Sequence, residues 1–375
     1  MGIIKEKCNE VKKVIEKGKI SAFQMALMMY PTIFSTAILI VPAITGKYAE
    51  RDMWISPIWG SLNGFLTVFV LYQLHNLYPK KTIIQYSEHV IGRIPGKVLG
   101  FAYLFFFLHT NGMILREYTD FIISSFLLKT PMIVVIGSMV LVCAFAVQGG
   151  VEVLGRASQL FIPNLIFMLF ILTILFLKDL DLKNMFPIME HGIMPSILGA
   201  AAPQSWFSEM FLISMLLPFL TDREKGMKWS MISVLAIMFS MIIFNLIAIF
   251  LFGGTTSSYV YPIFSAIRYI QIGNFIQHVE SVIIVIWVTG TFIKISVFYY
   301  ALVLSTAQWL NLSNYRSVVL PLGFLLMLFG MWGYRSIGET SKFTATILPF
   351  YTSFVLTLIP TLLLLIAIIR KKMKK

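Results

Sequence analysis

Two charged residues lie deep inside otherwise uncharged apolar runs of this chain. Lys294 stands near the middle of the run 281–307, and Glu209 stands equally deep in the run 195–220. A charge at the centre of a membrane-spanning helix costs roughly 2.5 to 3.5 kcal/mol, so it persists where it meets a partner or water. Both residues are therefore candidate functional groups. An ion pair between them would lower the desolvation cost of both.

Two interpretations of Lys294 and Glu209 remain open at this point. A buried lysine loses its proton readily, which makes proton exchange at this site chemically possible. The alternative is a static latch that holds two helices together without any ligand. Each residue lies about 14 residues from the start of its expected span, and both spans run in the same direction. We therefore expect the two side chains to share one depth in the membrane.

A second polar group follows one face of the segment 97–128. His109, Arg116 and Asp120 fall on one side of a helix, and Glu117 is adjacent. Arg116 and Asp120 have the i, i+4 spacing of a helical ion pair. We interpret these four residues as an outer gate over a central site. A salt bridge that only fixes helix packing is an equally good explanation, and His109 alone is more often a packing residue.

The composition identifies the elements that must position these groups. The chain has 375 residues, of which 58% are hydrophobic and only 13% are charged. This balance excludes a soluble globule and predicts an all-α, polytopic membrane protein. Spans of about 20 residues cross the hydrocarbon layer. Ten such windows are expected at 21–46, 54–78, 97–128, 131–147, 157–177, 195–220, 229–252, 279–309, 317–333 and 345–369.

Basic residues in the loops indicate the orientation. The net charge is +13, and 20 of the 30 Lys and Arg residues fall in the termini and the loops on their side, against 7 in the opposite loops. By the positive-inside rule both termini are cytoplasmic. The charge therefore indicates orientation and contact with anionic lipid, and no nucleic acid partner is expected. We expect a basic arm at 1–20, one transmembrane domain at 21–370 and a basic tail at 371–375.

The first apolar segment lacks a convincing cleavage site, so we expect it to remain as the first span. The two cysteines, Cys8 in the arm and Cys143 in the fourth span, are too far apart on this topology to form a disulfide.

The hydropathy pattern predicts two halves of five spans, 21–177 and 195–369. Because five is odd, the second half enters the membrane from the opposite side, as in the inverted repeats of secondary transporters. Amphipathic stretches at 86–94 and 269–275 occupy the same position in each half. We expect both stretches to form short helices at opposite faces.

Helix-breaking residues near mid-depth in the first and sixth spans predict interrupted helices and a substrate site between them. A simple proline kink is the alternative for each span. Aromatic and hydroxyl side chains on the third and eighth spans are weaker candidates, because such residues usually face lipid or the core. The expected substrate-binding residues are Pro31, Thr32, Ser35, Thr36, Phe107, Pro203, Gln204, Ser205, Trp206 and Thr291.

The sequence contains no phosphate-binding loop, no metal-ligand spacing and no nucleophile elbow. We therefore expect neither an enzyme nor a cofactor or metal site.

Several short motifs carry a family resemblance. They are Lys19-Ile20-Ser21, the span end Ala37-Ile38-Leu39-Ile40-Val41-Pro42, Arg116-Glu117-Tyr118, Ser208-Glu209-Met210-Phe211 and Ile293-Lys294-Ile295-Ser296. Together with the order of the spans over roughly 19–370, they resemble the spore germination permease family, the B subunits of nutrient germinant receptors. The resemblance implies a LeuT-like 5+5 bundle of the amino acid–polyamine–organocation superfamily in the inner membrane of the spore.

The resemblance also implies a function and partners. Such a subunit binds a small nutrient, an amino acid or a sugar, in a pocket of spans one, three, six and eight, and it signals to A-type and C-type receptor subunits. In related folds a sodium ion lies between spans one and eight, where Lys294 would stand. The chain departs from the wider superfamily because it lacks a Gly-rich unwound stretch in span one. A proton- or ion-coupled amino-acid transporter remains the alternative.

Overall fold

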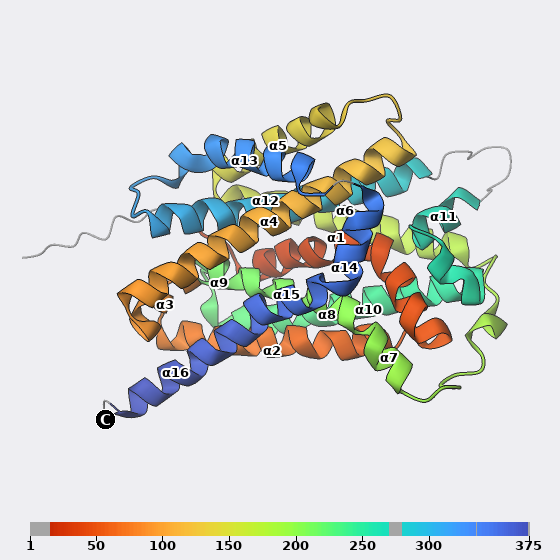
Figure 1. Ribbon diagram of the computed structural model, residues 1–375, viewed down its shortest axis with the longest axis horizontal. Coiled ribbons are helices and arrows are strands. Elements are labelled where there is room, and N and C mark those ends of the chain that lie inside the picture. The colour runs from red at the N-terminus through yellow and green to blue at the C-terminus, as the bar shows by residue number, and fades with distance from the viewer. Residues whose placement is uncertain (1–15, 270–279, 335, 374–375) are drawn as a thin grey trace, which may run out of the picture.

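The computed structural model describes residues 16–269, 280–334 and 336–373. Its regular elements in these ranges are helices that run mostly along the long axis of the molecule (Figure 1). Eight of the helices are long and apolar enough to cross a membrane. Two further segments complete the expected set of ten: a less apolar helix, α2 (Ser56–Leu77), and a segmented stretch at 194–219. The all-helical, multi-span prediction is confirmed.

The first half of the chain supplies five of these segments. After α1 and α2, a long α4 is followed by the shorter α5, as the sequence predicts, and Gly150 then separates α5 from α6. Gly150 has a φ of +87°, a conformation that glycine adopts without steric cost. The elements are α1 (Ala22–Ala49), η1 (Glu50–Asp52), α2 (Ser56–Leu77), α3 (Ile83–Ile91), α4 (Arg93–Ser125), α5 (Met132–Gly149), α6 (Val151–Phe176) and η2 (Leu182–Met185).

The second half repeats this order. A segmented sixth span is followed by long helices, a short helix and a final span with a π-helical turn. The elements are α7 (Met194–Gly199), α8 (Ala201–Ser208), η3 (Glu209–Leu212), α9 (Ile213–Leu216), η4 (Leu217–Phe219), α10 (Arg223–Phe252), η5 (Gly253–Ser258), α11 (Pro262–Tyr269), α12 (Glu280–Trp309), η6 (Tyr315–Val318), α13 (Val319–Trp332), α14 (Ile337–Thr346), α15 (Leu348–Ser353), η7 (Phe354–Leu358) and α16 (Ile359–Met373).

Short helices occupy matching positions in the two halves. In the first half α3 lies between α2 and α4, where the amphipathic stretch is predicted, and it ends at Gly92. In the second half α11 lies between α10 and α12. The predicted counterpart at 269–275 falls, except for Tyr269, outside the described residues. The short helix of the second half therefore lies upstream of the expected stretch.

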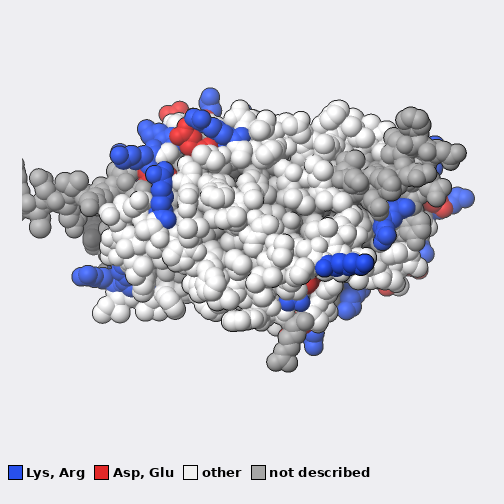
Figure 2. Space-filling model, turned by 90° about the horizontal axis from the view of Figure 1, so that it is seen from above, with Lys and Arg blue, Asp and Glu red and all other residues white. Residues whose placement is uncertain are grey.

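Three helices form the centre of the bundle. In their most apolar windows 83% of residues are buried in α1, 72% in α12 and 61% in α4, against 28% in α6 and α13. The peripheral helices expose Leu, Ile and Phe side chains, as lipid contact requires. Figure 2 shows Lys and Arg gathered toward the two ends of the long axis, with a nearly uncharged band between them. This band fits the hydrocarbon layer of a membrane.

One expectation about the first span is wrong. The prolines of α1 do not interrupt it, and the helix runs without a break through Pro31 and Pro42. Thr32 donates its hydroxyl hydrogen to the carbonyl of Met28 at 2.7 Å, and Thr45 does the same to Val41 at 2.8 Å. These two bonds add to the backbone hydrogen bonds of the helix, while the carbonyls that lose a donor to the prolines are those of Leu27 and Ile38, four residues before each proline. The expected interruption is present in the sixth span only.

The lead-in to α1 is tied to the end of the sixth span. Ile20 donates its N–H to the carbonyl of Phe219 at 3.0 Å, and Thr221 donates back to the carbonyl of Ile20 at 2.9 Å. Asp222 accepts a hydrogen bond from the N–H of Ala22 at 2.7 Å, at the first turn of α1. We call this set of contacts the inner latch. It joins the start of the first span to the end of the sixth.

Candidate functional site

The sixth span places Glu209 at a change of helix type. The α-helix α8 ends at Ser208, and the 3-10 helix η3 begins at Glu209. Gly60 of α2 permits the close approach of this segment, since a Cβ atom there would lie 2.9 Å from the backbone nitrogen of Gln204. Glu209 is 5% exposed. Its carboxylate therefore needs a partner inside the bundle.

That partner is Lys294 of α12, which is 1% exposed. Its Nζ donates to Oε1 of Glu209 at 3.0 Å and to Oε2 at 2.8 Å. The third donor of the ammonium group reaches Oγ1 of Thr36 on α1 at 3.0 Å. The expected ion pair is present, and all three ammonium hydrogens have acceptors.

Thr36 links three elements around this pair. Its Oγ1 also accepts a hydrogen bond from Nε1 of Trp206 in α8 at 2.8 Å. The hydroxyl oxygen therefore receives hydrogens from both α8 and α12 while its own backbone belongs to α1. Any ligand that displaces Lys294 from Glu209 must also disturb Thr36. We call Glu209, Lys294, Thr36 and Trp206 the central cluster.

The predicted outer-gate residues all have partners among the described residues. Arg116 and Asp120 form an ion pair at 2.9 Å. Glu117 accepts a hydrogen bond from Thr344 of α14 at 3.1 Å. His109 lies 3.4 Å from the hydroxyl of Tyr334. The α4 stripe thus contacts the connection from α13 to α15, a geometry that fits both a gate and a fixed packing contact.

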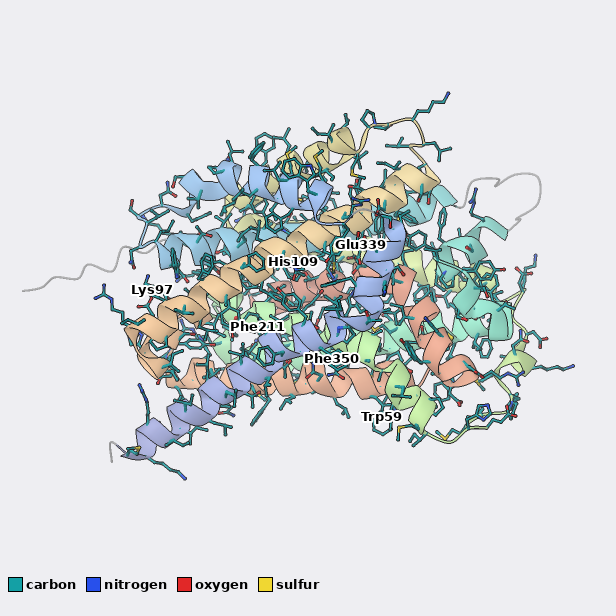
Figure 3. The ribbon with its side chains drawn as sticks, viewed as in Figure 1. Trp59, Lys97, His109, Phe211, Glu339 and Phe350 are labelled. Atoms are coloured by element: carbon teal, nitrogen blue, oxygen red, sulfur yellow. The ribbon has the colours of Figure 1, made fainter. Side chains whose placement is uncertain are left out.

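Figure 3 shows where three side chains lie along the bundle. Lys97 stands toward the end of the bundle where α16 ends, while His109 of α4 and Phe211 of η3 lie further inward. The ring of Phe211 packs against Phe107, with ring centroids 6.2 Å apart. Phe107, one of the predicted substrate-binding residues, is fully buried. In this structure it is part of the aromatic core beneath η3.

The remaining predicted substrate-binding residues divide into two groups. Pro31 and Ser35 line a void of about 10 Å³ beside Trp287, room for about one water molecule. Thr291, which is fully buried, leaves its hydroxyl without a hydrogen-bond partner among the described residues. Three others bond elsewhere or face α2: Ser205 to the carbonyl of Ala202, Gln204 to Ser353 of α15, and Pro203 at the contact with Gly60.

Sequence reasoning missed several polar partners. Thr344 holds Glu117, and Asn63 of α2 donates to the hydroxyl of Ser208 at 2.6 Å, directly before Glu209. Asn111 is fully buried on α4 and donates to the carbonyl of Ile295, next to Lys294. A polar amide inside an apolar span was a usable signal for Asn63 and Asn111. Thr344 carried none, since it lies just before the predicted tenth span.

Comparison with known sequences gives one family. The family model described as "Spore germination protein" matches residues 19–336. Spore germination protein KB of Bacillus subtilis (strain 168) is 26% identical over 371 residues, which cover 96% of this chain and 98% of that protein. Spore germination protein YndE of the same strain is 23% identical and covers 78% of this chain and 81% of its own length. The likeness therefore extends over nearly the whole transmembrane region.

Solved structures of transporters share the fold. MhsT in complex with L-phenylalanine has a TM-score of 0.62 at 13% identity and covers 94% of this chain and 99% of its own. A Na⁺-coupled sialic acid symporter in a substrate-bound, outward-open state has a TM-score of 0.63 at 12% identity, with 90% of this chain and 79% of its own covered. At such identities the likeness concerns the fold alone. It confirms the LeuT-like arrangement of two five-helix halves.

Proposed function

Since this chain belongs to the spore germination permease family, we propose that it is the membrane subunit of a nutrient germinant receptor. On this proposal it binds a small nutrient, an amino acid or a sugar, at the central cluster and signals to A-type and C-type partner subunits. Its location is the spore inner membrane, with both termini in the cytoplasm. The observation that carries the proposal is the buried Lys294–Glu209 pair held by Thr36.

The chemistry of the pair favours a ligand that carries both a negative and a positive charge. An amino acid carries a carboxylate and an ammonium group, so it can take over the contacts of Glu209 and Lys294 without adding net charge to the bundle. Removing only one partner would leave an unpaired buried charge. Exchange of the internal ion pair for contacts with a zwitterion therefore gives a low-cost route from a closed to a liganded state. A sugar would instead insert hydroxyl groups between the two side chains.

The position of the pair supports a signalling role. Its three elements, α1, the sixth span and α12, are distant in sequence but meet at one hydroxyl group. A ligand that separates Lys294 from Glu209 releases α12 from the sixth span. Because the inner latch ties the sixth span to the lead-in of α1, this release would reach the end of the bundle where partner subunits can respond.

A proton- or ion-coupled amino-acid transporter is the second candidate, and the shared fold with a Na⁺-coupled symporter favours it. Lys294 contacts α1 from α12 and could load and release a proton. Uptake of labelled amino acids into proteoliposomes separates the candidates. Rapid concentrative uptake by this protein without partner subunits would establish the transporter. Ligand binding without such uptake is expected for the receptor subunit.

A double variant tests the site assignment. Lys294→Met combined with Glu209→Met removes both charges at similar volume, so the fold should survive. We expect normal protein levels in spores but loss of the nutrient response. Glu152→Ala, which breaks an exposed pair with Arg156, is the control and should respond normally. A full nutrient response from the double variant would overturn the site assignment.

A further inference from the structure

A cavity of about 590 Å³ opens at the end of the bundle where α3 lies and α16 ends, which we call the basic end (Figure 1). It lies between the lead-in to α1, the start of α3, the end of η4 and the last turns of α12. Its size falls in the range of small-molecule sites. The lining residues are Glu16, Lys17, Gly18, Lys19, Lys80, Thr82, Gln85, Pro218, Phe219, Leu220, Arg223, Leu304 and Gln308.

The cavity carries an excess of positive charge. Lys17, Lys19, Lys80 and Arg223 line it, and among the described residues none of the four has a carboxylate within ion-pair distance. Four cations around one space repel one another unless an anion lies between them. The lining thus favours an anionic occupant.

The one carboxylate in the lining is already engaged. Glu16 is 8% exposed. It accepts hydrogen bonds from the N–H of Gly18 at 2.7 Å, from the N–H of Val151 at 3.3 Å and from the hydroxyl of Tyr300 at 3.3 Å. These contacts turn the carboxylate toward the first residue of α6 and toward α12. Glu16 therefore positions the lead-in, and because its hydrogen bonds leave its charge in place, the lining holds four cations against one carboxylate.

Part of the lining is apolar. Pro218, Phe219, Leu220 and Leu304 contribute hydrocarbon surface beside hydroxyl and amide groups of Thr82, Gln85 and Gln308. The cavity lies where spans end, at the expected depth of lipid headgroups. A lining that contains both basic and apolar residues matches a phosphate attached to an acyl glycerol. Basic pockets between helices at this membrane level are known lipid-headgroup sites.

We propose that this cavity binds a phosphate-bearing anion, supplied by the headgroup of an anionic phospholipid. Bound phosphate would draw together Lys17 and Lys19 of the lead-in, Lys80 before α3 and Arg223 at the start of α10. The same elements carry the inner latch between Ile20 and Phe219. An occupied cavity therefore stabilises the latched state. This inference concerns a second site and does not depend on the nutrient proposed for the central cluster.

The test uses the full-length protein purified in a neutral detergent. Binding of phosphatidylglycerol is measured by native mass spectrometry, and stabilisation by the shift in thermal midpoint. Phosphatidylcholine is the zwitterionic control, and inorganic phosphate tests a soluble source. We expect phosphatidylglycerol to bind and to raise the midpoint, while phosphatidylcholine has no effect. A shift with inorganic phosphate but not with lipid would retain the phosphate site and reassign its source.

The variant for this site is Lys19→Gln, Lys80→Gln and Arg223→Gln combined. Its control is Lys225→Gln, Lys228→Gln and Arg370→Gln, which removes the same charges near the basic end but outside the cavity lining. We expect the affinity for phosphatidylglycerol to fall roughly tenfold or more in the first variant and to stay nearly unchanged in the second. Equal losses in both would indicate general surface attraction and would overturn the proposal.

Two further measurements keep the test decisive. If the triple variant does not fold, Lys80→Gln alone, which alters only an exposed loop residue, should still weaken lipid binding more than Lys225→Gln. Binding of an acidic peptide such as polyglutamate, with no binding of phosphatidylglycerol or phosphate, would assign the cavity to a protein partner and refute the phosphate site.

Discussion

The first and sixth spans occupy equivalent positions in the two halves, and both contain proline near mid-depth, yet only one of them is broken. α1 is a single helix of 28 residues with two internal prolines. The sixth span is divided into α7, α8, η3, α9 and η4. In α1, Thr32 and Thr45 donate to backbone carbonyls of the preceding turn. Ser205 and Ser208 of the sixth span make the same kind of bond, to the carbonyls of Ala202 and Gln204. Hydroxyl groups therefore do not separate the two spans, whereas the close packing of Pro203 and Gln204 against Gly60 of α2 occurs at the broken span.

This difference separates two roles in the site. The continuous helix supplies a fixed acceptor, Thr36, whereas the segmented span supplies Glu209 at a joint between helix types. A residue at such a joint can move with small backbone changes, while a residue in a continuous helix cannot. We therefore expect the sixth span to be the part that responds to ligand and α1 to be the reference against which it moves.

The largest expected effect removes the charge on the segmented span. Glu209→Ala leaves the ammonium group of Lys294 buried with only Thr36 as an acceptor. Loss of one partner of a buried ion pair costs about 3–5 kcal/mol. Thermal unfolding of the purified protein should show this loss, and Glu152→Ala, at an exposed pair, should cost less than about 1 kcal/mol. Equal stability of the two variants would mean that the pair of Lys294 and Glu209 does not contribute to the stability of the fold.

The next effect concerns the fixed acceptor. Thr36→Val keeps the shape but removes the acceptor of both Lys294 and Trp206, and hydrogen bonds to charged groups contribute about 1.5–3 kcal/mol. Thr32→Val, one turn away on α1, removes only a bond to the carbonyl of Met28 and should cost about 1 kcal/mol. Chemical denaturation of both variants measures the difference. If Thr32→Val costs as much, then Thr36 has no special role.

A third change acts on the contact between Gly60 of α2 and the segmented sixth span. In Gly60→Ala the new methyl group would meet the backbone of Gln204 at 2.9 Å and that of Pro203 at 3.1 Å. Overpacking of this kind costs about 1–3 kcal/mol, more than alanine gains in helix propensity. A thermal scan should show the loss. Gly254→Ala, with no atom within 4 Å of the added carbon, is its matched control and should be neutral.

The smallest effect is expected at the proline of the continuous helix. Because α1 already runs through Pro31 without a break, Pro31→Ala should change the free energy of unfolding by less than about 1 kcal/mol. A rise of about 3 kcal/mol, the full helix penalty of proline, would show that α1 is strained at this point. Measuring the unfolding midpoint of this variant therefore checks whether the two spans differ as described.

Much of the architecture followed from the sequence, because burial in lipid leaves few solutions. Apolar windows located the spans to within a few residues, and the shared depth of Lys294 and Glu209 predicted their pairing. The positions of Arg116 and Asp120 on one helix face predicted the ion pair between them. These predictions succeeded because helical periodicity and the cost of buried charge act locally.

The predictions from sequence failed where the structure depends on contacts between elements distant in the chain. Proline alone could not tell a continuous helix from a broken one, since both spans contain it and the packing of Pro203 and Gln204 against Gly60 of α2 is a tertiary contact. The partner of Glu117 lies in α14, a short helix at the edge of a predicted loop and span. The substrate-binding roles of Gln204 and Ser205 stay predictions, and in this structure the two side chains bond to Ser353 and to the carbonyl of Ala202.

The balanced charges of the central pair have an electrical consequence. Lys294 and Glu209 carry opposite unit charges at nearly the same depth, so a shift that moves them together transfers no net charge across the membrane. The membrane potential does work only on displaced net charge, about 2.3 kcal/mol per unit charge per 100 mV. A nutrient response that is equal in polarised and depolarised vesicles would show that the two charges keep one depth when the nutrient separates them, and a response that differs would show that Glu209 moves along the membrane normal with the sixth span.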